Sequence, residues 1–469
     1  MRPYCLFREG GASFAYHVAS GRFIGTTPLA HELLELRLGN DAEEASAAFM
    51  GRHPAATDVL EDVAKLEEAG FFDPADPLDK DDGEFEAELD GRFSGPCNTL
   101  VLSVASGCNL ACRYCYCGTC RDELPDKGLM TEAIALKAVD GLFASADPDV
   151  DVRVTFFGGE PLLNKPVVKC VVAHCNKLAA ERGRKARYSM TTNATLVDDE
   201  MADLIVKNNF GLMVSLDGPR PLHDGQCPTR AGGGSFDLAV AGIRRLMDRG
   251  AKVTVRCTMA HPAPDAMELI RFFSEFGASR VVLGSVYNPA FPSACDFTEE
   301  DDRVFRRCVG EKVIPWMVSE RAAGRTPIYD PFDEIGEFQG EECHVDKVPG
   351  LRCGACHGAM AVAPDGVLYP CHRFVGMEKW SLGSLDEGLD RSRCMAFWRD
   401  YRAATRKTCA SCWAYRICGG PCPWEAARPD GTFGMVPRLC EDTRAWIRQG
   451  VSYFNKVGTI DRNKGGEEK

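Results

Sequence analysis

Between residues 97 and 290 the sequence alternates short apolar runs with longer amphipathic stretches. The apolar runs are typical of β-strands, and they lie at 99–104, 152–157, 187–192, 210–215, 252–259 and 280–286. Helical periodicity appears at about 130–144, 165–182, 198–208, 235–248 and 265–276. This alternation predicts an α/β fold with a parallel sheet wound by helices. Six strands are too few for a closed eight-stranded barrel.

Three cysteines follow the first apolar run at a spacing typical of metal ligands. Cys108, Cys112 and Cys115 form the pattern C-x3-C-x2-C. Thiolates are the usual ligands of a [4Fe–4S] cluster, and three of them on one loop leave the fourth iron open to a small molecule. Taken alone, the same residues are also compatible with a zinc knuckle or with scattered buried thiols.

Two further features give this loop a family resemblance. Tyr114 precedes the third cysteine, and Gly158-Gly159-Glu160-Pro161 follows the second apolar run. With the cysteine spacing, they resemble the radical S-adenosylmethionine (SAM) superfamily. The resemblance implies an open (β/α)6 partial barrel in which SAM chelates the open iron. It also implies that reductive cleavage of SAM yields a 5′-deoxyadenosyl radical, which abstracts a hydrogen from the substrate.

The resemblance places SAM contacts at the ends of the predicted strands. The glycines would allow close backbone approach, and Glu160 would accept a hydrogen bond from the SAM amine. Relatives usually carry an arginine at the position of Cys227, and Arg230 is the candidate that replaces it as a partner of the SAM carboxylate. His223 and Asp224 are explained equally well as part of a capped loop and as part of the site. The predicted SAM-binding residues are Tyr114, Gly158, Gly159, Glu160, Pro161, Asn193, Ser215 and Arg230.

A second cysteine array lies after residue 340. Its spacing resembles the seven-cysteine signature of the SPASM domain, which implies two auxiliary [4Fe–4S] clusters and therefore three clusters in the whole chain. Aux I would be held by Cys353, Cys371 and Cys422, and Aux II by Cys409, Cys412, Cys418 and Cys440.

The extra cysteine of this array is Cys356. It is either a fourth ligand of Aux I or a free thiol, and in the second case Aux I keeps an open iron for a substrate thiolate. A pair of zinc ribbons is the alternative explanation of the array, but it needs C-x2-C pairs repeated twice. Only Cys353/Cys356 and Cys409/Cys412 satisfy that pattern.

The chain divides into four predicted parts. Residues 1–92 combine a small α+β unit with an acidic linker at 73–92. Their hairpin and helices are similar to winged-helix peptide-recognition domains, which add a leader peptide to a sheet edge; a plain structural extension is the alternative. The radical SAM partial barrel follows at 97–290, a helical connector at 291–340 and the SPASM domain at 341–469.

Composition narrows the function classes. The net charge of −13 disfavours nucleic acid as a partner, and we expect no membrane-spanning segment and no signal peptide. We therefore expect a cytoplasmic protein. Its 23 cysteines are more typical of metal binding than of a disulfide scaffold in that setting.

The resemblance to SPASM-type radical SAM peptide maturases implies a peptide-modifying enzyme. The string Tyr369-Pro-Cys-His-Arg-Phe374 and the N-terminal unit resemble enzymes that join a Cys sulfur to a peptide carbon, such as the maturation proteins of quinohemoprotein amine dehydrogenase. The expected partners are a Cys-containing peptide or small protein with a leader, and a reductant such as flavodoxin or ferredoxin. The alternatives are a formylglycine-type sulfatase maturase, another SPASM peptide maturase, and a non-catalytic iron–sulfur electron-transfer scaffold.

Overall fold

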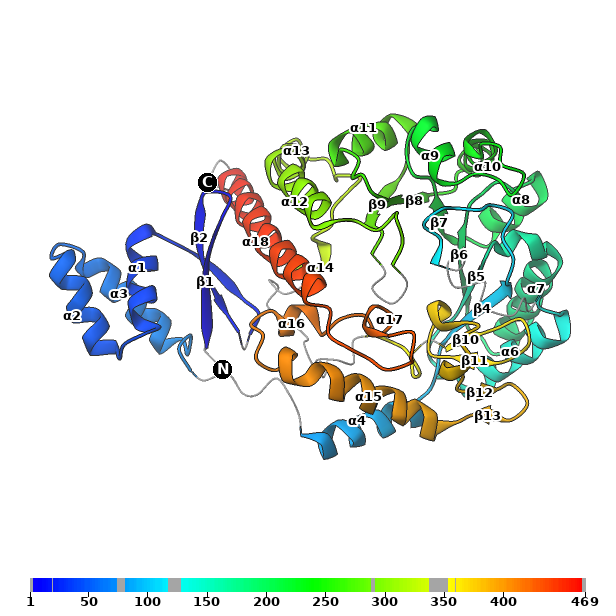
Figure 1. Ribbon diagram of the computed structural model, residues 1–469, viewed down its shortest axis with the longest axis horizontal. Coiled ribbons are helices and arrows are strands. Elements are labelled where there is room, and N and C mark those ends of the chain that lie inside the picture. The colour runs from blue at the N-terminus through cyan, green and yellow to red at the C-terminus, as the bar shows by residue number, and fades with distance from the viewer. Residues whose placement is uncertain are drawn as a thin grey trace.

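The computed structural model describes residues 3–18, 20–73, 81–116, 128–287, 292–336, 353–358 and 360–465. Its N-terminal unit stands at one end of the molecule, away from the large sheet (Figure 1). Strands β1 (Tyr4–Glu9), β2 (Ala12–His17) and β3 (Phe23–Thr26) form an antiparallel sheet in that order. Helices α1 (Pro28–Arg37), α2 (Ala42–Arg52) and α3 (Thr57–Glu68) follow, and Leu33, Leu34 and Phe49 are buried between these elements.

The large sheet confirms the predicted α/β architecture. Its six parallel strands pair in chain order: β4 (Thr99–Ala105), β5 (Val152–Gly158), β6 (Ala186–Thr192), β7 (Gly211–Ser215), β8 (Val253–Met259) and β9 (Arg280–Ser285). The helices between them are α6 (Glu132–Ser145), α7 (Lys165–Glu181), α8 (Asp199–Lys207), α9 (Arg220–Gln226), α10 (Phe236–Met247) and α11 (Ala266–Phe276). All six predicted strands are present, with ends within about two residues of the predicted ones.

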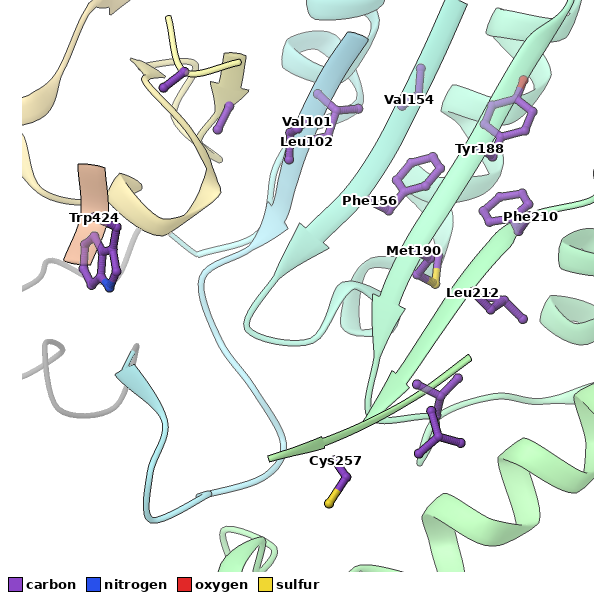
Figure 2. Close-up of a cluster of buried hydrophobic side chains, with 14 of the residues drawn as sticks. Val101, Leu102, Val154, Phe156, Tyr188, Met190, Phe210, Leu212, Cys257 and Trp424 are labelled. Atoms are coloured by element: carbon purple, nitrogen blue, oxygen red, sulfur yellow. The ribbon is translucent and has the colours of Figure 1, made fainter. Parts of the chain in front are cut away.

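A layer of aromatic side chains supports the middle of this sheet. Phe156, Tyr188 and Phe210 stack with ring centroids 5.1–6.5 Å apart. Figure 2 shows them on the neighbouring strands β5 and β6 and at the entry to β7. Stacked rings of this kind add to the free energy of apolar burial, and they fix the spacing of the strands whose far ends carry the candidate site.

The sheet is extended by a hairpin from the C-terminal part of the chain, which the sequence did not predict. Strand β10 (Met360–Val362) pairs parallel to β4, and β11 (Leu368–Tyr369) pairs antiparallel to β10. The large sheet therefore has eight strands. This pairing places β10 directly beside β4, the strand that leads into the first cysteine loop.

The prediction of a solvated acidic linker at residues 73–92 is wrong for the second half of that segment. Residues Asp82–Ser94 form helix α4, which packs along α15 (Arg391–Cys409) (Figure 1). Phe85 and Leu89 are buried on the shared face. Acidic side chains of α4 pair with arginines of α15, for example Glu86 with Arg399 at 2.6 Å. The acidic composition therefore marks a charged docking face; residues 74–80 lie outside the described part of the chain.

The remaining elements enclose the open side of the sheet. The predicted connector contains α12 (Glu299–Cys308), a π-helical turn (Val309–Val313), α13 (Ile314–Ala322) and α14 (Asp333–Gly336). A short 3₁₀ turn at Pro161–Asn164 lies between β5 and α7. The C-terminal part contains short 3₁₀ turns at His372–Phe374 and Glu378–Trp380, the ribbon β12 (Gly383–Ser384) and β13 (Gly388–Leu389), α16 (Tyr415–Cys418), α17 (Pro423–Ala426) and α18 (Pro437–Gly465). Helix α18 lies against β1 and so joins the two ends of the chain (Figure 1).

Candidate active site

A cavity of about 560 Å³ lies at the carboxyl ends of the parallel strands. It collects most of the predicted SAM-binding residues and all three cysteines of the first cysteine loop. Those that line it are Cys108, Cys112, Tyr114, Cys115, Gly158, Gly159, Glu160, Asn193 and Ser215. The cavity also borders Arg256 of β8 and the C-terminal residues His372, Arg373 and Glu425, which were not assigned to this site from the sequence.

The glycine turn after β5 is held directly against the cysteine loop. A Cβ on Gly158 would stand 2.3 Å from the carbonyl oxygen of Ala105, and Gly158 has a φ of +136°. The backbone N–H of Gly159 donates to Ala105, and that of Glu160 donates to the carbonyl of Gly107, both at 2.9 Å. Glycine is required here by close packing, and the turn fixes the backbone immediately before Cys108.

Glu160 is completely enclosed and already has three hydrogen-bond donors. Its carboxylate accepts from the backbone N–H of Leu162 at 2.9 Å, the hydroxyl of Thr192 at 2.8 Å and the backbone N–H of Asn193 at 2.8 Å. Burial raises the Glu160 pKa, while these hydrogen bonds oppose the shift. The carboxylate therefore ties the ends of β5 and β6 together, and only its remaining lone pairs are available to a ligand amine.

Asn193 connects the end of β6 to the cysteine loop. Its side-chain amide lies 3.7 Å from Sγ of Cys108 and donates to Oδ1 of Asn109 at 3.0 Å. The next residue, Ala194, has a φ of +59°, the conformation that favours glycine. The backbone at this position therefore has a shape for which alanine is less suitable than glycine.

A buried network that sequence reasoning did not find supports Tyr114. The Tyr114 hydroxyl donates to Oδ2 of Asp217 at 2.7 Å and lies 3.1 Å from Sγ of Cys227. Asp217 also accepts from the backbone N–H of Thr258 at 2.9 Å, and its own N–H donates to Nδ1 of His223 at 3.2 Å. Each group has a partner within the network, which explains why Cys227 is tolerated where relatives carry arginine.

Two of the predicted SAM-binding residues do not line the cavity. Pro161 begins the 3₁₀ turn behind Glu160. Arg230 donates from Nε to the backbone carbonyl of Cys108 at 2.5 Å. The hydrogen bond comes from an exposed side chain, so Arg230 holds the cysteine loop from its outer side. Arg230 is therefore not among the residues that line the cavity.

The C-terminal part of the chain supplies one wall of the cavity. His372 packs on Phe157 with ring centroids 4.1 Å apart. The guanidinium of Arg373 lies 3.6 Å from Glu425 and 4.0 Å from Sγ of Cys422. Burial and the neighbouring Arg373 hold the His372 pKa at about 4, so the imidazole is neutral at pH 7.

The four cysteines of the predicted Aux I group lie close to one another. Burial raises the pKa of Cys371 to about 12, and the Cys422 and Cys353 thiols add to the shift. Cys356 is 1% exposed and has a φ of +66°. Its raised pKa arises from burial and from the Cys394 thiol of α15, with Cys353 and Cys371 also nearby. Cys394 is therefore an additional thiol beside this group that the spacing rules did not identify.

Two of the four predicted Aux II cysteines line a second cavity, of about 720 Å³. Cys418 and Cys440 line it together with Cys353 and Cys422 of the Aux I group. Burial raises the pKa of Cys440, and the charge of Arg444 opposes the shift. The nearby Cys412 thiol adds to the increase. Cys409 lies at the end of α15, and its backbone carbonyl accepts from the N–H of Cys412 at 2.9 Å.

The donor chemistry of the first cavity fits a cluster with SAM. Three thiols converge on it from one loop, and the two adjacent glycines leave backbone exposed where side chains would fill the space. Burial raises the pKa of Cys108 to about 11 when no metal is bound. A bound metal ion reverses this preference, because its charge stabilises the thiolate.

Comparisons with known proteins agree with this arrangement. Residues 102–273 match the family model described as the Radical SAM superfamily. The chain is 26% identical over 379 residues to the serine-type anaerobic sulfatase-maturating enzyme of Klebsiella aerogenes, covering 76% of this chain and 87% of that protein. It is 22% identical over 340 residues to the cysteine-type enzyme of Clostridium perfringens, covering 70% and 89%.

Solved structures share the fold. The chain matches anSMEcpe with bound AdoMet at a TM-score of 0.65 and 19% identity, covering 78% of this chain and 96% of that one. It matches Streptococcus suis SuiB bound to S-adenosylmethionine at a TM-score of 0.51 and 17% identity, covering 90% and 95%. Among the described residues, no helix has both the length and the apolarity to cross a membrane.

The family model and the sequence matches together show that residues 102–273 form a radical SAM domain and that the chain is homologous to the anaerobic sulfatase-maturating enzymes.

Proposed function

We propose that this protein is a radical SAM enzyme that modifies a peptide or protein. The observation that carries the proposal is the single cavity in which the thiols of Cys108, Cys112 and Cys115 meet the glycine turn of Gly158 and Gly159. A [4Fe–4S] cluster and SAM, when bound, supply a carbon-centred radical that removes a hydrogen atom from the substrate. The homologous maturases support a polypeptide as the substrate.

In this proposal the residues of the chain bind SAM, orient it and shield the site from water. Gly158, Gly159 and Glu160 fix the backbone against which SAM would lie, and Asn193 and Arg230 hold the cysteine loop in place. The Phe157–His372 pair and Arg373 close the opposite side. An enclosed site of this kind keeps water away from reactive intermediates.

For the C-terminal array we propose two auxiliary [4Fe–4S] clusters, which gives three in all. Proximity of Cys353, Cys356, Cys371 and Cys422 supports Aux I, and the groove shared by Cys418 and Cys440 supports Aux II. A flavodoxin or ferredoxin is the proposed reductant. Cys356 is proposed as the fourth ligand of Aux I, since it is buried beside Cys353 and Cys371.

The N-terminal unit is proposed to recognise the leader of the substrate. The sheet order β1-β2-β3 leaves β3 as an outer strand, to which an extended peptide can add by backbone hydrogen bonds. Deletion of residues 1–73 would then weaken peptide processing while SAM cleavage without peptide persists. Equal turnover of the peptide by the truncated protein would show that the unit has a structural role alone.

Two outcomes of peptide modification are proposed. Formation of a Cys sulfur-to-carbon thioether is supported by the Tyr369–Phe374 string, where His372 follows the Aux I cysteine. Oxidation of a Cys or Ser residue to formylglycine is supported by the homology to sulfatase-maturating enzymes over about three quarters of the chain. The homology supports formylglycine formation as strongly as the Tyr369–Phe374 string supports thioether formation.

Anaerobic incubation of the reconstituted protein with SAM, a reductant and Cys-containing peptides distinguishes these outcomes. In mass spectra a thioether keeps sulfur and loses hydrogen, whereas formylglycine made from cysteine loses the sulfur. Release of 5′-deoxyadenosine separates either reaction from a non-catalytic electron-transfer scaffold. A protein that binds iron and never cleaves SAM would overturn the proposed function.

A further inference from the structure

Arg256 lies inside the candidate active site on a strand that the sequence did not connect with SAM. It belongs to β8, next to Ser215 of β7 in the register of the sheet. Along β8 the residues alternate between buried positions and positions that face the cavity, and both Arg256 and Thr258 line it. The guanidinium therefore enters the same space as the cysteine loop and the glycine turn.

This guanidinium has no anionic partner within the described part of the chain. None of the ion pairs or side-chain hydrogen bonds formed by those residues involves Arg256. Burial, followed by the nearby charge of Arg373, lowers the Arg256 pKa, against the opposing effects of Cys257, Tyr114 and Asp217. An enclosed cation without a counter-charge in contact with it is costly, and an anion entering the cavity would reduce that cost.

The second arginine of the cavity provides a direct contrast. Arg373 lies 3.6 Å from the Glu425 carboxylate, and its guanidinium sits over the rings of Tyr116 and Trp424 at 5.7 and 5.6 Å. Its charge is therefore balanced by residues of the chain itself. Arg256 lines the same cavity, and its guanidinium makes no hydrogen bond or ion pair with a described residue.

The neighbouring strand leaves space for the guanidinium. A Cβ on Gly284 of β9 would stand 2.2 Å from Nη2 of Arg256 and 2.6 Å from its Cζ. Any larger residue at position 284 would push the arginine aside. The guanidinium position is thus determined by the backbone of β9 as well as by its own strand.

We propose that Arg256 binds the carboxylate of a ligand in the active-site cavity. The planar guanidinium suits a carboxylate because it can donate two parallel hydrogen bonds. The carboxylate comes either from SAM or from an acidic side chain of the substrate peptide. The proposal rests on the proposed function for the identity of these ligands, and binding measurements test it separately from turnover.

The test compares the parent protein with Arg256→Met, both reconstituted anaerobically. Equilibrium dialysis measures SAM and its decarboxylated analogue. In SAM-loaded protein, ligand-observed NMR compares N-acetyl-aspartate and N-acetyl-glutamate amides with their neutral asparagine and glutamine counterparts. Loss of a charge-assisted pair is expected to weaken carboxylate binding roughly 10- to 100-fold.

The two sources give different patterns. If SAM supplies the carboxylate, Arg256→Met weakens SAM and leaves the decarboxylated analogue unchanged. If the substrate supplies it, SAM binding is unchanged, while the acidic amides lose affinity and the neutral amides do not. Equal effects on ligands with and without a carboxylate, or no effect on any of them, would overturn the proposal.

Two further variants complete the test. Lys252→Met removes one positive charge just before β8 at an exposed position, and it should leave every affinity unchanged. Arg256→Lys keeps the charge and loses the two-pronged geometry, so an intermediate loss of affinity is expected. This variant also decides the proposal if Arg256→Met does not fold. Failure of SAM cleavage with intact carboxylate-dependent binding would count against the proposed function alone.

Discussion

Gly159 lies against Gly107 so closely that a Cβ on Gly159 would stand 2.1 Å from the Gly107 carbonyl oxygen. The contact joins the turn after β5 to the residue that precedes Cys108. The Gly107 carbonyl belongs to the backbone, so it cannot rotate away as the end of a flexible side chain can. The two loops of the candidate site therefore depend on each other for their shape.

Gly159→Ala should separate these loops. We expect loss of SAM binding and of the iron held by Cys108, Cys112 and Cys115, because the added methyl group forces backbone to move. Equilibrium dialysis and iron analysis measure both effects. Gly141→Ala is the matched control: its Cβ meets nothing within 4 Å on the exposed face of α6, and it should stabilise the protein by up to about 1 kcal/mol. Normal SAM binding by Gly159→Ala would contradict the geometry of the turn.

Replacing Cys108, Cys112 and Cys115 together by Ala should remove about one third of the iron, since one of three four-iron clusters is lost. SAM cleavage should disappear while the absorbance of the other clusters remains. Cys175→Ala, in the apolar core on α7, should keep the full iron content. Zinc in the C-terminal array, or surviving SAM cleavage in the triple variant, would refute the cluster assignment.

Helix α4 should be held to α15 by its apolar side chains more than by its charges. Leu89→Ala is expected to lower the free energy of unfolding by about 2–5 kcal/mol, because Leu89 is fully buried. Glu86→Gln breaks a partly exposed pair with Arg399 and should cost less than about 1 kcal/mol. Urea unfolding of the two variants measures the difference. A larger loss for Glu86→Gln would show that charge dominates this interface.

Asp301 should stabilise the fold in a pH-dependent way. Burial opposes its ionisation, but hydrogen bonds from Thr298, Ala263 and His261 outweigh that effect and hold its pKa well below the usual range. Because folding lowers this pKa, the stabilisation is complete above the unfolded-state value of about 3.9 and is lost as the pH falls through the folded-state pKa.

The measurement is urea unfolding of Asp301→Asn and the parent protein between neutral and acidic pH. We expect the variant to be less stable by about 1–3 kcal/mol at pH 7. The gap should be constant down to about pH 4 and should shrink below it. A gap that grows with acidity would contradict the lowered pKa.

Cys356 offers a test that separates backbone strain from ligation. Its φ of +66° favours glycine, so in metal-free protein Cys356→Gly should be more stable than Cys356→Ala by about 1 kcal/mol. In iron-loaded protein both variants should make Aux I reactive toward added thiols, as judged by its spectrum. Spectra identical to those of the parent, with no thiol response, would show that Cys356 is not a ligand.

Much of the parallel sheet was determined locally by the sequence. The runs that became β4 to β9 are apolar and lie between amphipathic stretches, and periodicity of this kind reports which face of each element is buried. The end of each strand follows from the same pattern, which is why Cys108, Gly158, Asn193 and Ser215 could be assigned to one edge of the sheet. Neighbouring parallel strands bring their carboxyl ends together regardless of the details of packing.

Contacts between distant segments were decided only by the tertiary structure. The pairing of β10 with β4, the docking of α4 on α15 and the approach of Cys394 to Cys356 join residues far apart in the chain. Spacing rules describe neighbours along the chain and carry no information on such contacts. For the same reason Arg230 was expected in the cavity, whereas Arg256 occupies it: the side that an arginine faces depends on its strand register and on the space left by Gly284.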